Sequence, residues 1–457
     1  MSSIDDALKY IATNEIRWID LQFTDVKGTL HRVSVSNRKI EPNSFIDGIN
    51  AADLVKVFGE TGQKDLVLLP DPDTISRLPW EPSTVRFICN IMTGDSKEHF
   101  SHDSRYIAER LETNLAAQGI RNALIGAEVD CYMFDTATAD KTSRARGAGT
   151  LMDSREARWS PSPLSNEDRG AFVVTPHDGM YSARAQISET MQDSFGFPVD
   201  GHRHGEAPTA QQTFDLTERS LKTAADGLHT LKFITRNLAN AVNASATFMP
   251  YPIEGEKGSG LAVSVSLWKS TDSNLFFDSK EDYGQLSQAG RYFIGGLLEH
   301  ANTLCAFCLP TPNSYRRLAI NNPSFGWSAV KTDTVVSVPS SHKNSKEAKR
   351  IVFALPDPSI NSYLAYSLIV AAGLDGIKNK LDSADPAESV AKKPGNKIKE
   401  LPSTLMEALM ALDSDDKFVR GIVSSEFLDA YVELKHVQHI ESLKGVSALE
   451  LHKYYNV

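Results

Sequence analysis

The sequence predicts an α+β protein with a small β-rich domain over residues 1–102 and a larger mixed domain over residues 103–457. Short apolar runs separated by Pro, Asp and Gly continue up to about residue 92, which is typical of short strands. Near residue 103 this pattern gives way to helical spacing. The length of 457 residues also exceeds one average domain, so two units are expected.

The clearest element of the small domain is a β-hairpin over residues 14–36. Apolar residues alternate with polar ones from Ile19 to Phe23, and Lys27-Gly28 supplies a turn after which the alternation resumes. This period of two indicates strands with one buried face.

The larger domain combines predicted helices, one buried strand and two polar segments. Apolar residues recur every three or four positions over 217–243, and Thr404 and Glu407 form a capping box that opens the C-terminal helices. The other predictions are helices over 103–119 and 284–308, a strand over 123–135, a flap or loop over 136–170 and a polar linker over 381–400.

Composition limits the classes of partner. The chain is 41% hydrophobic and 23% charged, as is typical of globular proteins, and its net charge is −10. An acidic chain without a long apolar run argues against nucleic acid or a membrane as the main partner. Four cysteines in this length do not suggest a disulfide scaffold, so we expect a cytoplasmic protein.

Residues 258–267, GSGLAVSVSL, predict a strand whose second face has been trimmed to small side chains. Leu261, Val263 and Val265 form the apolar face, whereas Ala262 and Ser264 lie on the other. Such a face either packs closely on a neighbouring strand or leaves room for a ligand.

Glu128 and Asp130 are two apart on the predicted strand over 123–135, so both carboxylates leave the same face. Two like charges in an apolar run are costly unless a cation or hydrogen-bond donors meet them. The pair therefore indicates either a metal site or a strand edge that faces solvent.

Two further groups of side chains are weaker candidates. His202, His204 and Glu206 in GHRHGE share a period-two face, which fits a transition-metal site or a surface strand. Cys305 and Cys308 form a CxxC on the apolar stripe of a helix, where a core role is favoured over redox or zinc chemistry.

Two pairs of basic residues lie beside turn-forming sequences. Arg316-Arg317 follows PTPNSY, and Lys349-Arg350 precedes a short apolar run that ends in PDPS. Paired bases suit the recognition of phosphate or carboxylate, and they are equally common as solvated charges.

These segments, in this order, resemble the glutamine synthetase family, in particular the type I enzymes of archaea and bacteria. The resemblance runs collinearly from about residue 10 to the last residue, and no single motif carries it. The matching segments are IRWIDLQFTDVKG, PDPDTISRLPW with VRFIC, GAEVDCYMFD, ATFMPYP with GSG and SVSL, PTPNSYRRL, LPDPSINSYLAYSLIVAAGLDGIKNK, LPSTLMEALMALDSDDKFV and YYNV.

The resemblance implies an N-terminal β-grasp domain and a C-terminal α/β catalytic domain of the glutamine synthetase type. It also implies a homo-oligomer, a double ring of twelve subunits with active sites between neighbours. In that family ATP phosphorylates the γ-carboxylate of glutamate and ammonia displaces the phosphate. Mg²⁺ or Mn²⁺ ions neutralise the phosphates and the glutamate oxygens.

The metal-ligand positions of the family are only half retained in this sequence. Asp130 and Glu206 stand for two glutamates of one ion site, and Glu128 stands for one ligand of the nucleotide-side site. Relatives have Glu, His and Glu at the positions that the resemblance assigns to Phe214, Ala262 and Val352. Apolar side chains cannot hold a hard, oxygen-seeking cation.

Other family positions are divided in the same way. The resemblance assigns catalytic positions to Asp47 and Arg317, and cofactor-binding positions to His204, Ser266 and Arg350. At other positions the resemblance implies a changed residue: Ser264 stands where relatives have a second histidine, Ala354 and Val330 where they have arginines, Pro323 where they have a flap glutamate, and Tyr251 where they have a lysine. Phe172 keeps the aromatic residue near the substrate.

We therefore expect weak or absent binding of ATP and divalent metal. The first hypothesis is a glutamine-synthetase-fold pseudoenzyme with a scaffold, regulatory or small-molecule-binding role, and a genuine glutamine synthetase is a candidate partner. The alternative is an ATP-dependent carboxylate–amine ligase with another substrate, or a weak glutamine synthetase. Removing one well-placed electrostatic stabiliser costs about 10²–10³ in rate, so several losses favour the first hypothesis.

Overall fold

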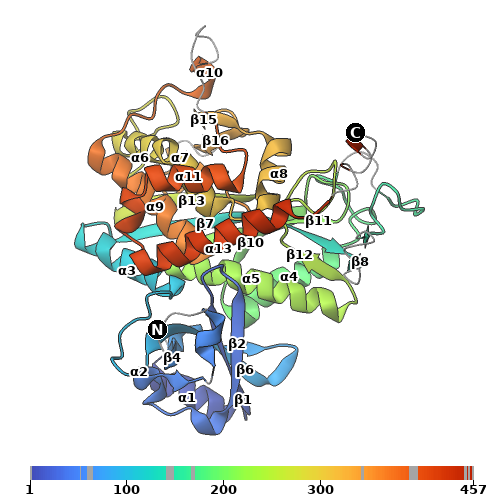
Figure 1. The fold of residues 1–457 in the computed structure, drawn as a ribbon, viewed down its shortest axis with the longest axis vertical. Coiled ribbons are helices and arrows are strands. Elements are labelled where there is room, and N and C mark those ends of the chain that lie inside the picture. Colours follow the sequence, from blue (N-terminus) through green and yellow to red (C-terminus); the bar gives the residue numbers. More distant parts are fainter. Residues whose placement is uncertain are drawn as a thin grey trace.

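The computed structural model describes residues 3–51, 53–58, 65–139, 149–165, 170–340, 344–390, 400–446, 450 and 453–454. The segments 136–170 and 381–400 and the terminal YYNV therefore lie partly outside the described residues. Figure 1 shows a small N-terminal domain with its own sheet beneath a larger domain of strands and helices. No helix among the described residues is long and apolar enough to cross a membrane.

The small domain is a six-stranded mixed sheet in the order β2-β1-β6-β4-β3, with β5 paired to β6. The predicted hairpin is confirmed, because β1 and β2 pair antiparallel with Ile19 opposite Val35, whereas β1 and β6 run parallel. Its elements are α1 (Ile4–Thr13), β1 (Trp18–Thr24), β2 (Leu30–Ser36), α2 (Ser44–Asp47), β3 (Ile49–Asn50), β4 (Leu66–Pro70), β5 (Ser76–Leu78) and β6 (Glu81–Thr93).

The larger domain is built on a nine-stranded sheet in the order β10-β11-β7-β13-β17-β16-β15, with β12 on β7 and β14 on β13. Its strands are β7 (Asn122–Phe134), β10 (Val199–His204), β11 (Gln211–Ser220), β12 (Ser245–Thr247), β13 (Leu261–Ser270), β14 (Ser273–Asn274), β15 (Ser324–Ser328), β16 (Thr334–Ser337) and β17 (Ile351–Phe353). A separate hairpin pairs β8 (Thr136–Ala139) with β9 (Thr150–Asp153).

The helices of this domain include the predicted ones, with two changes. They are α3 (Ser104–Ala117), α4 (Tyr181–Phe195), α5 (Leu221–Ala241), α6 (Gln288–Glu299), α7 (Ala301–Cys308), α8 (Pro312–Asn321), α9 (Ser362–Asn379), α10 (Ala387–Val390), α11 (Leu405–Ser414), α12 (Lys417–Arg420) and α13 (Ser425–Leu443).

The predicted helix over 284–308 is wrong as a single element, because His300 separates α6 from α7. Its imidazole contacts Asp375 of α9 at 3.1 Å and Asp415 after α11 at 2.7 Å. The predicted helix over 217–243 begins only at Leu221, because the preceding residues continue β11 and pair with β7. Cys305 and Cys308 are buried in the core of α7, as predicted.

The large sheet divides each strand into a core face and a site face. Ile125, Val129 and Cys131 of β7 belong to the main hydrophobic core together with the leucines of α5. Glu128 and Asp130 point to the opposite face. The alternation read from the sequence thus places both carboxylates on the face that α5 does not cover.

The two domains are joined by hydrogen bonds at the β1–β2 turn. The Asn361 side-chain amide, at the start of α9, donates to the backbone carbonyls of Asp25 and Val26 at 3.4 and 3.3 Å. Gly28 has a φ of +83°, and a Cβ there would lie 2.6 Å from Cα of Asn361. Only glycine fits this turn, so its tip is held against the larger domain.

Candidate functional site

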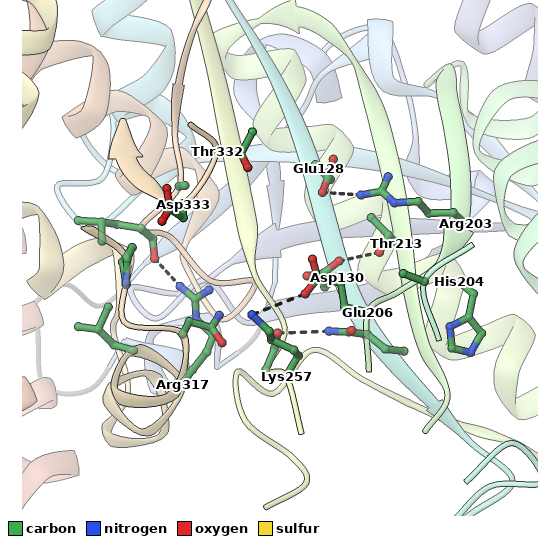
Figure 2. Close-up of a pocket in the computed structure, with 18 of the residues that line it drawn as sticks. Glu128, Asp130, Arg203, His204, Glu206, Thr213, Lys257, Arg317, Thr332 and Asp333 are labelled. Atoms are coloured by element: carbon green, nitrogen blue, oxygen red, sulfur yellow. Dashed lines mark hydrogen bonds and ion pairs between the residues drawn. The ribbon is translucent and has the colours of Figure 1, made fainter. Parts of the chain in front are cut away.

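A cavity of about 430 Å³ lies on the uncovered face of the large sheet. Figure 2 shows side chains reaching it from β7, β10 and β11, from the loop before β13, and from α8. The charged residues that line it are Glu128, Asp130, Arg203, His204, Glu206, Lys257, Arg317 and Asp333.

Asp130 is a half-buried carboxylate of the cavity, on β7. It accepts hydrogen bonds from the Thr213 hydroxyl at 2.7 Å and from the Gly260 backbone N–H at 3.0 Å. Burial raises the pKa of Asp130 to about 6, against the lowering effect of these two hydrogen bonds. The carboxylate is therefore held by protein donors, as Figure 2 shows for Thr213.

Glu128 is paired with an arginine from the neighbouring strand. Arg203 Nη2 lies 2.6 Å from Oε1 of Glu128, and Arg203 Nη1 lies 3.4 Å from both carboxylate oxygens of Asp215. Figure 2 shows Glu128 and Arg203 pointing toward one another. The two carboxylates and the guanidinium form one charge cluster in which the protein supplies the cation.

Glu206 lies at the mouth of the cavity rather than on its floor. Its side chain is 70% exposed, and its Oε2 is 3.6 Å from Nζ of Lys257. A pair this exposed is screened by solvent and holds neither side chain firmly. Glu206 lies two residues beyond the end of β10, so it is not part of the sheet face that carries Asp130.

Arg317 reaches the cavity from α8, whose N-terminus is fixed by a capping box between Thr311 and Ser314. Its guanidinium donates to the backbone carbonyls of Leu355 and Pro356 at 2.5 and 3.0 Å. The side chain is buried, and burial lowers its pKa. These contacts leave part of the guanidinium facing the cavity beside Asp130.

His204 has both ring nitrogens engaged by acceptors. Nε2 lies 3.1 Å from Oε2 of Glu156, and Nδ1 lies 2.9 Å from the Gly205 carbonyl oxygen. Burial alone would lower the pKa of His204, but the hydrogen bond to Glu156 and its charge outweigh burial and raise it. Both ring nitrogens therefore face acceptors within the protein, and in its protonated form the imidazole donates to both oxygens.

The proposed transition-metal site at GHRHGE does not form. His202 contacts Nε of Arg184 at 3.2 Å, His204 is turned toward Glu156, and Glu206 lies out in the mouth of the cavity. Among the residues that the structure describes, no group of three His, Cys, Asp or Glu side chains is placed to hold a metal ion. Alternation predicted a shared face, but β10 ends at His204 and the chain turns away.

The strand over 258–267 is confirmed as β13, with Leu261, Val263 and Val265 in the core. On its other face Ala262 lies opposite Glu128, and Ser264 lies opposite Gly126 on β7 and Val352 on β17. The hydroxyl of Ser264 donates to Glu218 at 3.3 Å. This face of β13 has small side chains, as the sequence indicated, and the carboxylate of Glu218 on β11 lies against it.

Arg350 and Ser266, the predicted cofactor-binding residues of this region, lie outside the lining of the cavity. Nε of Arg350 is 3.9 Å from Oε1 of Glu218, and burial raises the pKa of Glu218. Ser266 is only 1% exposed and accepts a hydrogen bond from the indole of Trp268 at 3.0 Å. Their roles toward a nucleotide stay predictions.

The prediction that Phe214 occupies the position of a lost metal ligand in the cavity is wrong. Its side chain is fully buried in the main core, on the face of β11 opposite to the cavity. The residue of β11 that points to Asp130 is its neighbour Thr213. Because adjacent strand residues face opposite sides, an alignment shifted by one position exchanges a pocket residue for a core residue.

Asp47 lies in the small domain at the end of α2, outside the lining of this cavity. Its carboxylate forms an exposed ion pair with Lys97. Within one chain it therefore has no access to Asp130 or Arg317, and its catalytic role stays a prediction that needs a neighbouring subunit. Phe172, Pro323 and Ala354 do line the cavity, and Phe172 is 81% exposed there.

Sequence reasoning missed several residues that define the cavity. Arg203 lies between the two histidines of GHRHGE, and period-two alternation already placed it on the face opposite to theirs. Lys257 stands in the polar stretch before β13. Glu156 falls within the predicted flap, and no pattern in the sequence pointed to its pairing with His204.

Comparisons with known proteins place this architecture in a family. The sequence families described as "Glutamine synthetase, catalytic domain" and "Glutamine synthetase, beta-Grasp domain" match residues 101–454 and 15–94. The glutamine synthetase of Sulfolobus acidocaldarius is 37% identical over 443 residues, which cover 94% of this chain and 93% of that protein. The chain belongs to the glutamine synthetase family.

Two further similarities support the same conclusion. The glutamine synthetase of Vibrio cholerae is 32% identical over 481 residues, and the match covers 100% of this chain and 100% of that protein. The structure of Plasmodium falciparum glutamine synthetase superposes with a TM-score of 0.88 at 22% identity, covering 100% of this chain and 99% of that one, which shows the fold. The predicted α+β fold, with a β-grasp domain before the catalytic domain, is confirmed.

Glutamine synthetases use ATP and divalent metal ions, and the residues of this cavity do not fit those ions. Glu128 is bound to Arg203, Asp130 is satisfied by Thr213 and Gly260, and Glu206 is exposed beside Lys257. Ala262 and Val352, on the adjoining strands, bring no metal-binding atom in their side chains. Instead, the guanidinium of Arg203 lies between the carboxylates of Glu128 and Asp215.

Proposed function

We propose that the chain is a glutamine synthetase homologue without glutamate–ammonia ligase activity, whose cavity binds a small molecule in a scaffold or regulatory protein. The observation that carries this proposal is the 2.6 Å contact between Arg203 and Glu128. Arg203 neutralises the one carboxylate that the sequence keeps for the nucleotide-side ion. A divalent ion would have to compete with a guanidinium that also contacts Asp215, in a cluster that is partly exposed, with Arg203 33% and Glu128 48% accessible.

The expected loss of rate supports the same conclusion. Phosphoryl transfer from ATP depends on cations that neutralise the phosphates and on positioned arginines. Each missing stabiliser costs about 10²–10³ in rate, and here the changes include Ala262, Val352 and Ala354. Even with strong non-additivity, little of the family's acceleration is expected to remain.

Phosphate release with ATP, glutamate, ammonia and either Mg²⁺ or Mn²⁺ tests this proposal. We expect no turnover above the rate without protein, while the Sulfolobus acidocaldarius relative assayed in parallel gives an ordinary enzyme rate. The comparison with that relative controls for the assay conditions. Turnover by this chain at a comparable rate would refute the proposal.

The 37% identity to a curated glutamine synthetase favours a second candidate, an ATP-dependent ligase that joins another amine or acid. Arg317, Asp130 and Glu128 would then form a reduced site. Calorimetry with ATP and with ADP, each with Mg²⁺, separates the candidates. Saturable nucleotide binding supports the ligase, and its absence supports the pseudoenzyme.

We also propose a homo-oligomer, in the form of a double ring of twelve subunits, because the family match extends over both domains. Asp47 then contributes to a site only through a neighbouring subunit. Light scattering on the purified protein measures the mass of the assembly, and a monomer would contradict this part of the proposal. Co-purification of a genuine glutamine synthetase would identify the candidate partner.

A further inference from the structure

A second cavity, of about 540 Å³, lies where the β1–β2 turn of the small domain meets α5 of the larger one. In Figure 1 this turn reaches up to the helices of the larger domain. Four basic side chains line the cavity, and no carboxylate is among its lining residues in the part of the chain that the structure describes. They are Lys27, His229, Lys232 and Arg236.

Three of these side chains come from one helix. His229, Lys232 and Arg236 are spaced three and four residues apart on α5, so they share one face. Lys27 reaches the cavity from the opposite side, on the turn that Gly28 and Asn361 hold in place. Burial lowers the pKa of His229, so the positive charges that the fold brings together from two domains are those of the lysines and the arginine.

The buried members of the cluster have too few partners. Lys232 is 8% exposed, and its ammonium donates to the Ile360 carbonyl at 3.3 Å, which uses one of its three donors. Nε2 of His229 is buried without a hydrogen-bond partner, and its ring stacks on Tyr363. Buried polar atoms are normally satisfied, so the Lys232 ammonium lacks acceptors and Nε2 of His229 lacks a partner.

The neighbouring charges do not supply that acceptor. Among the described residues Lys27, Lys232 and Arg236 take part in no ion pair. The nearby buried carboxylate of Asp357 is hydrogen-bonded to Ser359 and does not pair with Lys232, although it partly offsets the charge. Burial, together with the charge of Arg236, lowers the pKa of Lys232 to about 7.

We propose that this second cavity binds a small, multiply charged oxyanion, held by Lys27 and Arg236 at its mouth and by Lys232 and His229 on its floor. Arg236 is exposed and lies 5.5 Å over the ring of Phe248, so its guanidinium is free to bind an anion from one side. Asn237 and Asn313 also line the cavity, and each amide nitrogen already donates one hydrogen bond, to the Phe233 and Tyr251 carbonyls, which leaves one N–H of each for a ligand. Phosphate esters and polycarboxylates share the oxyanion chemistry that this lining recognises.

The cavity is separate from the candidate active site, and the proposal does not depend on whether the chain is an enzyme. Its position between two domains means that a bound anion would join Lys27 of the small domain to α5 of the large one. Binding should therefore stabilise the contact between the domains by mass action.

Isothermal titration calorimetry of the intact assembly in a phosphate-free buffer tests the proposal, with inorganic phosphate and citrate as probes. We expect saturable binding, and we expect Lys27→Ala and Arg236→Ala each to weaken it about tenfold, the effect of one charged hydrogen bond. Tighter binding of phosphate or of citrate assigns the site to phosphate esters or to polycarboxylates, and either result supports an oxyanion site.

Two variants serve as controls. Lys39→Ala removes an exposed lysine of the same domain that does not line the cavity and should leave binding unchanged. Lys257→Ala removes a cation of the first cavity. The proposal is refuted if neither probe binds saturably, if Lys27→Ala and Arg236→Ala bind as tightly as the wild type, or if Lys257→Ala alone abolishes binding.

Discussion

The guanidinium of Arg203, on β10, lies 2.6 Å from the carboxylate of Glu128 on β7, although β11 separates the two strands. The side chain crosses over Thr213 and Asp215 of β11 to reach it. This contact neutralises a carboxylate that relatives would offer to a metal ion. The contact changes the charge of the cavity, because a positive side chain of the protein lies between the carboxylates of Glu128 and Asp215.

Removal of this arginine should increase the affinity for a divalent ion. In Arg203→Ala, Glu128 and Asp215 lose their shared cation, so a metal no longer competes with a guanidinium. We expect Mn²⁺ to bind about tenfold more tightly than to the wild type, as measured by calorimetry. Arg316→Ala, which removes an exposed arginine outside the cavity lining, is the matched control and should show no change.

Thr213, the residue of β11 that faces the cavity beside Asp130, is the position at which we expect an added carboxylate to bind a metal ion. Thr213→Glu should place a carboxylate beside Asp130 and increase Mn²⁺ binding while the protein stays folded. Phe214→Glu should instead bury a charge in the core and lower stability by more than about 4 kcal/mol. Thermal unfolding with and without Mn²⁺ distinguishes the two variants. Equal stability of the two would mean that the strand register is wrong.

The sequence predicted the faces of the strands better than the contacts between them. Alternation placed Glu128 and Asp130 on one face and Leu261, Val263 and Val265 in the core, and the structure confirms both. Alternation is local, because each strand reports only its own two faces. It does not give the register between β10 and β11, which decides that Arg203 meets Asp215 and Glu128.

The remaining differences have the same origin in long-range contacts. At the break between α6 and α7, His300 contacts the carboxylates of Asp375 and Asp415, which are far along the chain. Glu156 is paired with His204 from within a segment that reads as a polar loop. No periodic pattern records such pairs, since they form only when separate elements pack.

The pKa of Asp130 predicts a pH-dependent loss of stability. A carboxyl whose pKa is raised from 3.8 to about 6 in the folded state stabilises the fold at low pH, and this contribution is lost as pH rises through about 6. Asp130→Asn removes the titration and keeps an acceptor for Gly260. Urea unfolding in EDTA should show that the variant gains about 1 kcal/mol over the wild type between pH 5 and pH 8.

Thr217→Val is the control for that measurement. It removes a hydroxyl of β11, the strand next to that of Asp130, whose hydrogen bond to Asp200 is exposed. Its stability relative to the wild type should not change with pH by more than about 0.5 kcal/mol. The raised pKa of Asp130 would be contradicted if the difference in stability between the wild type and Asp130→Asn stayed constant between pH 5 and pH 8.

The pair formed by His204 and Glu156 predicts the pH dependence of a second contact. The raised pKa of His204 means that the charged pair contributes fully below pH 6.5, the ordinary value, and is lost as pH rises through the folded-state pKa above it. Glu156→Gln keeps an acceptor for the backbone N–H groups of Gly179 and Met180 but removes the charge. Urea unfolding should show that Glu156→Gln is destabilised by about 1–3 kcal/mol at pH 6 and by less at pH 9. The control Glu433→Gln, the same change at an exposed position, should leave the stability unchanged at both pH values. A destabilisation that is the same at both pH values would mean that His204 is uncharged in the folded protein.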